Sequence, residues 1–451
     1  LKMQLLKIKR PQIPEGGNNY PMHIIQSPLF DFEAFIKSKD NNRLVVVLEA
    51  LPAEKLLFTL EREHWTGRKG YPVRGMWAAL IAGLLNQCES LAEIVRLVER
   101  DKDTRTICGF AKDNIPSDDA LGRFLKKLVI HEKLLEECFT GLVERLRALL
   151  PGFGAKLSVD STDIKAYANG YRKNPADTDA RWGVKGEGYQ EDESETEAVA
   201  KESKRKAPST GSGRERELYR WFGYKLHLVV DARYELPVSF MVTPANESDT
   251  KQMKPLLKKA AIDQPEHKPD AIIADKGYDS KDNCLMIFQD CHAAPIIPLV
   301  EKSDWESPDI CNAKGTPTCG CGLEMAYWGR DGNYLKYRCP QAVGKGKCRS
   351  RFPCTASSYG YVLKLPVMKE DYRRHVPVPR ESKKWARLYR MRTAVERVNS
   401  RVKELLGLGN ITVRGIAKVT VRSLLSLLVM LAAAVGMAQR HRLKEVRSLV
   451  G

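Results

Sequence analysis

The chain has 451 residues, of which 43% are hydrophobic, so it can form two or three domains with buried cores. It carries 74 Lys and Arg against 56 Asp and Glu, a formal net charge of +18. This composition excludes a generally disordered chain and favours a polyanionic partner, because Lys and Arg displace the counterions that surround phosphates.

The first region, residues 1–150, is predicted to form a helical domain. Apolar residues recur at helical spacing in "MWAALIAGLLNQ", "SLAEIVRLVERD" and "EKLLEECFTGLVERLRALL". Ser117 precedes "DDALGRF" and is a predicted N-cap, with acidic residues in the first helical turn. Short helices joined in this way occur in DNA readers and in plain packing or dimerisation units, so DNA-end binding and dimerisation both stay open.

After Gly154 the pattern changes to short runs rich in β-branched residues, which predict strands. Helical patterns follow the third and fourth runs, so the order is strand, strand, strand, helix, strand, helix, strand. This order predicts an α/β fold with a mixed sheet and flanking helices. The five predicted strands are "AKLSVDSTDIKAY", "YKLHLVVD", "LPVSFMVTPA", "DAIIADKGYDS" and "AAPIIPLV".

Two insertions interrupt this sheet domain. Residues 170–217 include "EDESETEAVAKESKRKAPSTGSGRERE", a charged, Ser- and Gly-rich tract that predicts a flexible loop. Residues 301–384 are rich in Cys, Gly and Pro and predict a small separate module. The sheet domain therefore comprises residues 151–300 and returns with the helices of residues 385–451.

The uncharged stretch "SLLSLLVMLAAAVGMAQ", residues 423–439, is shorter than the roughly 20 apolar residues that a bilayer requires, so we expect a buried core helix and no membrane. The opening residues lack the apolar run and small residues of a secretory signal. The 11 cysteines are then expected as reduced thiols, and the protein as cytoplasmic.

Acidic residues stand at three places where a working carboxylate is expected. Asp160 follows "LSV" in the first strand, Asp275 follows "AIIA" at the end of the fourth, and Glu396 lies in the basic helical segment "LYRMRTAVERVNSRVKELLGL". Burying a charge costs several kcal/mol unless it is paired or bound to metal. Each of the three is therefore either a member of a cap or ion pair or a functional carboxylate.

Helical geometry places Glu396 among cations. At 100° per residue, Tyr389, Arg392, Glu396 and Lys403 fall within an arc of about 60°, and the apolar residues lie on the other side. A surface ion pair between Arg392 and Glu396 produces part of the same array, although such a pair contributes only tenths of a kcal/mol.

Together these residues resemble the DDE transposases of prokaryotic insertion sequences, in the subgroup with a Tyr–x2–Arg–x3–Glu–x6–Lys signature. The signature is matched without a gap from Tyr389 to Lys403, and "VDST" at 159–162 and "ADKGYDS" at 274–280 look like the first two family motifs. The helical front end, with "GYPVRGMWAALIAGLL", is similar to the N-terminal domain of many such transposases.

The resemblance implies a ribonuclease H-like catalytic core and a transposase that cleaves element ends and transfers strands into target DNA. Asp160, Asp275 and Glu396 would be the catalytic carboxylates and would hold two Mg2+ or Mn2+ ions, because hard ions prefer oxygen ligands. Tyr389, Arg392 and Lys403 would bind DNA phosphates. The implied partners are double-stranded DNA at the inverted repeats and target, and a second copy in a homodimer at the prokaryotic nucleoid.

Neighbouring candidates are weaker. Asp163, three residues after Asp160, lies on the opposite face of a regular strand. Asp249 in "TPANESDTKQM" is expected to be a helix N-cap, and His227 in "YKLHLVVD" an ordinary structural histidine.

Six cysteines crowd into residues 311–354, around the hairpin-like "YWGRDGNYLKY", and suggest a zinc ribbon. The spacing is not two clean Cys–x2–Cys pairs, so the ligand set stays open. The chosen ligands are Cys319, Cys339, Cys348 and Cys354, with Cys321 as the substitute.

Two other functions remain open at this point. A nuclease of the same fold would use the same carboxylates without strand transfer. A DNA-binding transposase derivative that has lost its activity is the other, although the intact Asp160, Asp275 and Glu396 count against it.

Overall fold

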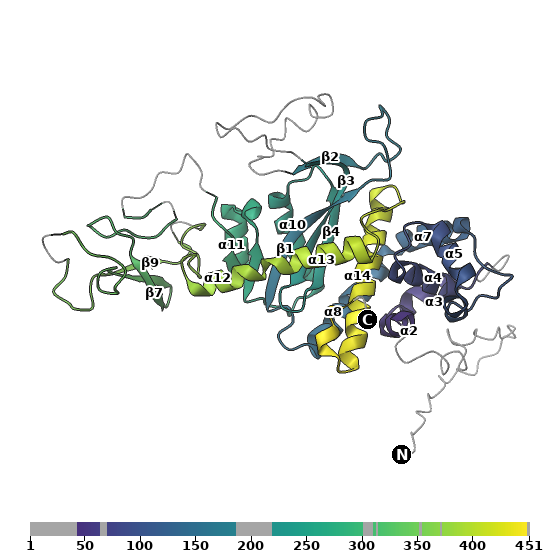
Figure 1. Cartoon of the computed structure of the whole chain (residues 1–451), viewed down its shortest axis with the longest axis horizontal. Coiled ribbons are helices and arrows are strands. Elements are labelled where there is room, and N and C mark those ends of the chain that lie inside the picture. The colour runs from purple at the N-terminus through teal and green to yellow at the C-terminus, as the bar shows by residue number, and fades with distance from the viewer. Residues whose placement is uncertain are drawn as a thin grey trace, which may run out of the picture.

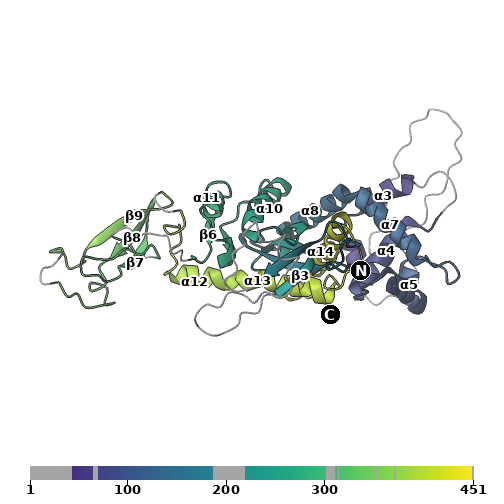
Figure 2. The ribbon, with the colours of Figure 1, turned by 90° about the horizontal axis from the view of Figure 1, so that it is seen from above.

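Three regions follow one another along the long axis of the molecule. The computed structural model describes residues 43–63, 70–185, 219–300, 310–312, 314–350, 354–369 and 372–448. The N-terminal helices and a small three-stranded sheet lie at opposite ends, and the main sheet lies between them (Figure 1, Figure 2).

The described part of the N-terminal region is entirely helical, which confirms the helical prediction there. Ser90 begins one helix by accepting a hydrogen bond from the Glu93 N–H, and Ser117 begins another by accepting from the Ala120 N–H, as expected of N-caps. The helices are α2 (Arg43–Ala50), α3 (Glu54–Glu63), α4 (Val73–Leu85), α5 (Leu91–Arg100), α6 (Lys102–Ile107), α7 (Asp118–Ile130) and α8 (Glu132–Leu149).

The main sheet contains all five predicted strands. Strand β3 (Tyr219–Asp231) pairs antiparallel with both β1 (Lys156–Lys165) and β4 (Leu236–Pro244). On the other side of β1, β5 (Ala271–Ala274) pairs parallel with β1, and β6 (Ala294–Ile296) pairs parallel with β5. The order β4-β3-β1-β5-β6 is the ribonuclease H-like arrangement that the family resemblance implied.

The predicted flexible loop over residues 170–217 differs from the structure at its beginning. Residues 181–185 form a further strand, β2 (Arg181–Lys185), which pairs antiparallel with the start of β3. The charged Glu- and Ser-rich composition begins only after this strand, so the prediction extended too far toward the N-terminus. Residues 186–217 of that expected loop lie outside the described residues.

Aspartates just before β2 explain why this segment is ordered. Asp177 is buried and accepts a 2.6 Å hydrogen bond from the Tyr224 hydroxyl and one from the Gly415 N–H. Asp179 accepts from the Ile416 N–H at 2.9 Å. These carboxylates satisfy N–H groups at the start of the last long helix, where negative charge is favourable.

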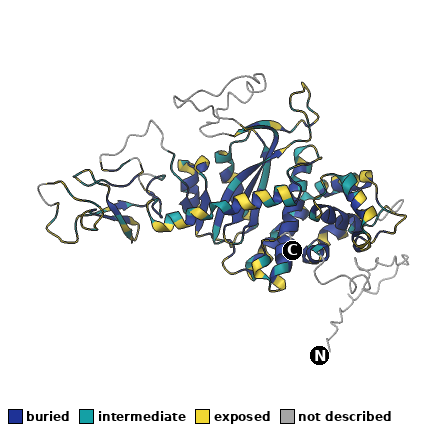
Figure 3. Ribbon diagram, viewed as in Figure 1, coloured by how far each residue is buried: buried dark blue, intermediate teal, exposed yellow. Residues whose placement is uncertain are grey.

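Helices cover both faces of the sheet. In Figure 2, α10 (Asp249–Asp263) and α11 (Lys281–Gln289) lie on one side, and α12 (Lys383–Tyr389) and α13 (Thr393–Ser400) run along the other. The 3-10 turn η2 (Arg390–Arg392) joins α12 to α13, and the π-helical turn η3 (Arg401–Leu405) continues α13. Figure 3 shows α13 with one buried and one exposed side.

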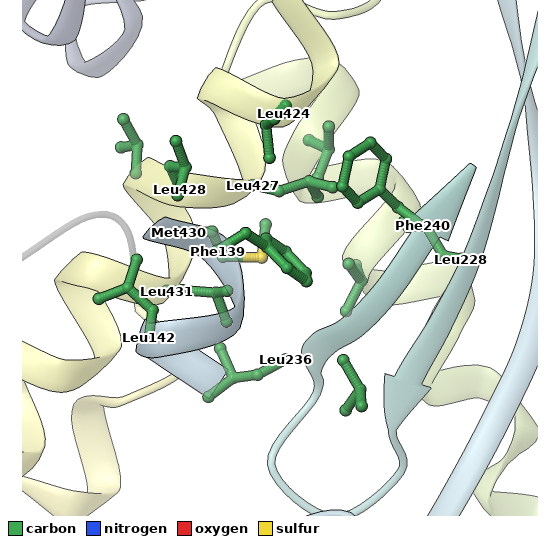
Figure 4. Packing of buried hydrophobic residues seen from close by; sticks show 14 of the residues in the cluster. Phe139, Leu142, Leu228, Leu236, Phe240, Leu424, Leu427, Leu428, Met430 and Leu431 are labelled. Carbon is green, nitrogen blue, oxygen red and sulfur yellow. The ribbon is translucent and has the colours of Figure 1, made fainter. Parts of the chain in front are cut away.

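The apolar segment 423–439 is a buried core helix, as predicted. It belongs to α14 (Ile416–Gln439), which among the described helices is the one long and apolar enough to cross a membrane. However, 89% of its most apolar window is buried inside the fold. Figure 4 shows its leucines packed against Phe139 of α8 and Phe240 of β4, so packing within the protein accounts for its hydrophobicity.

The Cys-rich insertion forms a separate antiparallel sheet of three strands, β7 (Ala326–Asp331), β8 (Tyr334–Arg338) and β9 (Val362–Pro366). Leu335, Tyr337 and Leu365 are buried on one face of this sheet. We call this sheet and its flanking loops, the described residues from 310 to 369, the Cys-rich module.

Candidate active site

Two of the predicted carboxylates lie side by side at the end of β5. Strands β1 and β5 pair in parallel, and the last pair in register is Val159 with Ala274. The next residue of each strand is Asp160 or Asp275, so the main-chain register itself brings the two aspartates onto neighbouring strands, which are about 4.8 Å apart in a sheet. The carboxyl ends of parallel strands are where open α/β sheets bind ligands.

Asp275 is held by the turn that follows β5. One carboxylate oxygen, Oδ1, accepts a 2.8 Å hydrogen bond from the Gly277 N–H. A Cβ at position 277 would stand 3.1 Å from the same oxygen, so glycine leaves room for the carboxylate. The turn therefore fixes the direction of Asp275 and uses only one of its oxygens.

Asp160 lies in an environment that disfavours its charge. Burial raises the pKa of its carboxyl to about 7, and the negative charges of Asp275 and Asp249 add to this effect. Lys185 and the Ser161 N–H oppose the shift without cancelling it. A cation bound between the carboxylates would relieve this repulsion.

Helix α13 carries Glu396 to the face of β1 on which Asp160 lies. The Ser158 hydroxyl donates a 3.1 Å hydrogen bond to the backbone carbonyl of Arg392, and Ser158 shares a strand face with Asp160 two residues later. The buried residues Val395 and Val398 hold the inner side of the helix, whereas the Glu396 side chain is 47% exposed.

Arg392 links the helix to the strands. Its guanidinium contacts Glu396 Oε1 at 2.7 Å. Burial lowers the pKa of Arg392, but Glu396 and, more weakly, Asp160 raise it above its ordinary value. The positive charge thus lies within electrostatic reach of both a helix carboxylate and a strand carboxylate.

Tyr389 joins the same group. Its ring stacks on Trp385 with centroids 4.8 Å apart, and the Arg392 guanidinium lies 5.9 Å from its ring centre. Burial raises the pKa of Tyr389, and the charges of Asp275 and Glu396 contribute to the increase. The charge of each predicted carboxylate therefore acts on Tyr389, on Arg392 or on both.

The three carboxylates are near one another but do not yet surround one point. Within the described ranges of the chain, no three Asp, Glu, His or Cys side chains are arranged so that they would hold an ion as they stand. Glu396 is turned to Arg392 instead. An ion at this site would have to bind Glu396 beside Arg392 or in its place.

Lys403 is engaged by Asp163 in the structure. Its Nζ lies 2.7 Å from Asp163 Oδ1, and the Tyr219 hydroxyl donates to the other oxygen at 3.1 Å. Burial would raise the pKa of Asp163, but the hydrogen bond and charge of Lys403 outweigh it and lower the pKa. Lys403 is thus already paired, and its partner Asp163 lies in β1 three residues after Asp160.

The expected N-cap role of Asp249 is not what the structure shows. The N-cap position of α10 belongs to Ser248, and Asp249 Oδ1 lies 3.2 Å from the Nζ of the buried Lys225. His227 is buried, and its Nε2 lies 2.9 Å from the Thr243 hydroxyl, so it has the structural role that was expected.

Two further residues of the site were missed in the sequence. Tyr278 is fully buried, and its pKa is raised well above the ordinary value by burial and then by the charges of Asp249, Asp160 and Asp275. Lys225 also donates to the Glu247 carbonyl at 2.7 Å. Their signals were a tyrosine inside the second motif and a lysine inside an apolar strand.

Comparisons with known proteins identify the family of the chain. A family model described as "Transposase DDE domain" matches residues 151–432, and one described as "Transposase domain (DUF772)" matches residues 30–127. No curated protein matches the chain.

One solved structure, described as a cryo-EM structure of the piggyBac transposase synaptic complex with hairpin DNA, is 9% identical in sequence. The match covers 90% of this chain and 78% of that one, with a TM-score of 0.36, which is too low for an inference about this chain. The Transposase DDE domain match spans well over half of the chain and contains all three carboxylates, so the chain belongs to the DDE transposase family and is a DNA transposase.

Proposed function

We propose that this transposase cleaves DNA at the ends of its insertion sequence and joins the freed 3′ hydroxyl to target DNA at Asp160, Asp275 and Glu396. The observation that carries the proposal is the register of β1 with β5, which makes Asp160 and Asp275 neighbours. The Ser158–Arg392 hydrogen bond, which holds the Glu396 helix on the same strand, supports it further.

The donor set fits divalent Mg2+ or Mn2+. All three side chains offer hard carboxylate oxygens, and the raised pKa of Asp160, caused mainly by burial, is typical of a carboxylate placed where a cation is needed. Asp160, Asp275 and Glu396 would hold the ions. When bound, the ions activate the attacking oxygen and neutralise charge on the leaving oxygen.

Basic side chains next to the carboxylates would hold the DNA backbone. Arg392 is half-buried, and when Glu396 turns away its planar guanidinium can make a bidentate contact with a phosphate. Lys403 would exchange Asp163 for a phosphate, and the Tyr389 hydroxyl would position the same strand. In this proposal DNA and the ions replace the internal ion pairs of the free protein.

A complete reaction needs two element ends, and we propose a homodimer that brings one active site to each. The N-terminal helices, which match a transposase domain, would bind the ends or form the dimer. The reaction would take place in the prokaryotic cytoplasm, at the nucleoid, where the thiols of the chain stay reduced.

The test is cleavage of a supercoiled plasmid that carries the DNA flanking the gene, in buffer with Mg2+. Wild-type protein should nick it at the repeats, and Asp275→Asn should abolish nicking while binding to the same DNA persists. Asp282→Asn, an exposed aspartate in the first turn of α11, is the matched control and should stay active. Full activity of Asp275→Asn would disprove the assignment.

A further inference from the structure

Four thiols gather in the loops of the Cys-rich module, in a region separate from the carboxylates. The sulfurs of Cys319 and Cys321 lie 3.1 Å apart, and the Cys348 thiol lies within hydrogen-bonding reach of the Cys321 sulfur. Cys354 is close enough for its charge to act on Cys348. All four are free cysteines and none is fully buried, so the group lies at the surface of the module.

The backbone forms a tight turn around Cys319 and Cys321. The Gly322 N–H donates to the Cys319 carbonyl at 2.8 Å, and Gly322 has a φ of +78°, which a side chain would strain. The Cys319 N–H donates to the Leu323 carbonyl at 2.9 Å, so both ends of the turn are held by main-chain hydrogen bonds.

In the second loop a backbone N–H points at sulfur. The Ser350 N–H donates to the Cys348 sulfur at 3.4 Å, and the Cys348 N–H is held at 3.0 Å by the Gln341 side chain. Hydrogen bonds from backbone N–H groups stabilise a negative sulfur and are typical of the surroundings of metal-bound thiolates.

We propose that Cys319, Cys321, Cys348 and Cys354 bind one structural zinc ion. A set of four thiolates binds Zn2+ in preference to Mg2+, and structural zinc sites are four-coordinate. The set differs from the sequence-based choice in one position, because Cys321 replaces Cys339. Cys339 continues β8 instead, where its N–H donates to the Tyr361 carbonyl at 2.8 Å and its Cβ faces Gly360.

Zinc binding requires a rearrangement of the two loops. Among the residues that the structure describes, no three ligands surround an ion position as they stand. Two thiolates on one tetrahedral zinc, with Zn–S bonds of about 2.3 Å, are about 3.8 Å apart. The Cys319 and Cys321 sulfurs, now 3.1 Å apart, therefore need to separate by less than an ångström.

The module has a reason to need such an ion. Its three short strands bury few apolar side chains, among them Leu335, Tyr337 and Leu365, and a sheet of this size gains little stability from burial alone. A zinc ion that joins the loop at Cys319 to the loop at Cys348 would supply folding free energy directly. The ion would thus keep the module folded next to the catalytic core.

Metal analysis of the full-length protein, purified with reductant, tests the proposal. Wild type should contain one zinc per chain, and Co2+ in its place should give the absorption bands of tetrahedral thiolate coordination. Cys321→Ser should lose the zinc, whereas Cys339→Ser, the matched control, should keep it. Zinc kept by Cys321→Ser and lost from Cys339→Ser would overturn the ligand set, and a wild-type protein without zinc would overturn the site.

A second measurement avoids variants that fail to fold. Alkylation of wild-type protein, with and without a zinc chelator, should show the four proposed thiols protected until the chelator is added. Cys339 should react equally in both conditions. Equal reactivity of all five thiols with and without chelator would contradict the proposal. DNA cleavage tests the carboxylates and zinc content tests the cysteines. The two proposals can therefore fail separately.

Discussion

The strand half and the helix half of the active site are built in different ways. Asp160 and Asp275 stand on neighbouring strands whose register is fixed by main-chain hydrogen bonds. Glu396 stands on the exposed side of α13, where it pairs with the Arg392 side chain, and the Ser158 hydroxyl holds the Arg392 backbone carbonyl. The strand half is therefore set when the sheet forms, whereas the helix half can open by exchanging one ion pair.

In the strand half, the buried Asp160 carboxylate is predicted to lower the stability of the folded protein. The pKa of Asp160 is about 7 in the folded protein, against an ordinary value of 3.8, because of burial. The folded state then holds its proton more tightly, so the stability of metal-free protein falls as pH rises from about 4 to about 7. The full loss, at most about 4 kcal/mol from a shift of about 3 pH units, applies above pH 7.

Asp160→Asn should remove this loss. In urea unfolding with EDTA, the variant should match the wild type near pH 4 and be more stable by about 1 to 4 kcal/mol at pH 8. Mg2+ should narrow the gap at pH 8, since it binds the wild type alone. An equal stability difference at both pH values would show that the Asp160 charge is not the cause.

The position of the helix half should depend on the hydrogen bond from Ser158 to the Arg392 carbonyl. Ser158→Ala removes the hydroxyl that holds the Arg392 carbonyl, and we expect a loss of about 1 kcal/mol in stability and of about tenfold in cleavage rate. Ser239→Ala, a buried serine on β4, is the control and should leave the rate unchanged. An unaffected rate in Ser158→Ala would mean that Glu396 is positioned by other contacts.

The smallest effect is expected at Lys403. If DNA phosphate replaces Asp163 as its partner, Lys403→Ala should reduce the slope of log affinity against log salt by about 1, with the largest loss at low salt. Lys268→Ala, exposed before the amino end of β5, should leave the slope unchanged. A slope that Lys403→Ala does not alter would show that Lys403 stays with Asp163 when DNA binds.

Much of the fold could be predicted because the strands carry strong local patterns. The apolar runs around Asp160 and Asp275 predicted β1 and β5. The spacing of 100° per residue assumed one regular helix around Glu396, whereas the 3-10 turn η2 and the π-helical turn η3 flank α13. Strand β2 was missed because it is short and contains Gly183, with a charged residue at each end. Its place depends on pairing with β3, which no local pattern encodes.

The partners of the site residues could not be predicted for the same reason. Lys225 meets Asp249 only because the β3–β4 pair brings the start of α10 over the sheet. The choice between Cys321 and Cys339 likewise depends on which turns of the Cys-rich module meet, and cysteine spacing does not determine that. Local sequence predicts elements and faces, whereas contacts between distant residues need the tertiary structure.

The central claim is that Glu396 completes the site that Asp160 and Asp275 begin. The most direct test compares Glu396→Gln with Glu404→Gln, an exposed glutamate two turns later, in Mg2+-dependent cleavage of plasmid carrying the flanking DNA. We predict that Glu396→Gln loses cleavage by at least about a thousandfold, about 4 kcal/mol, while it still binds DNA and Glu404→Gln remains active. Cleavage by Glu396→Gln at the wild-type rate would contradict the account.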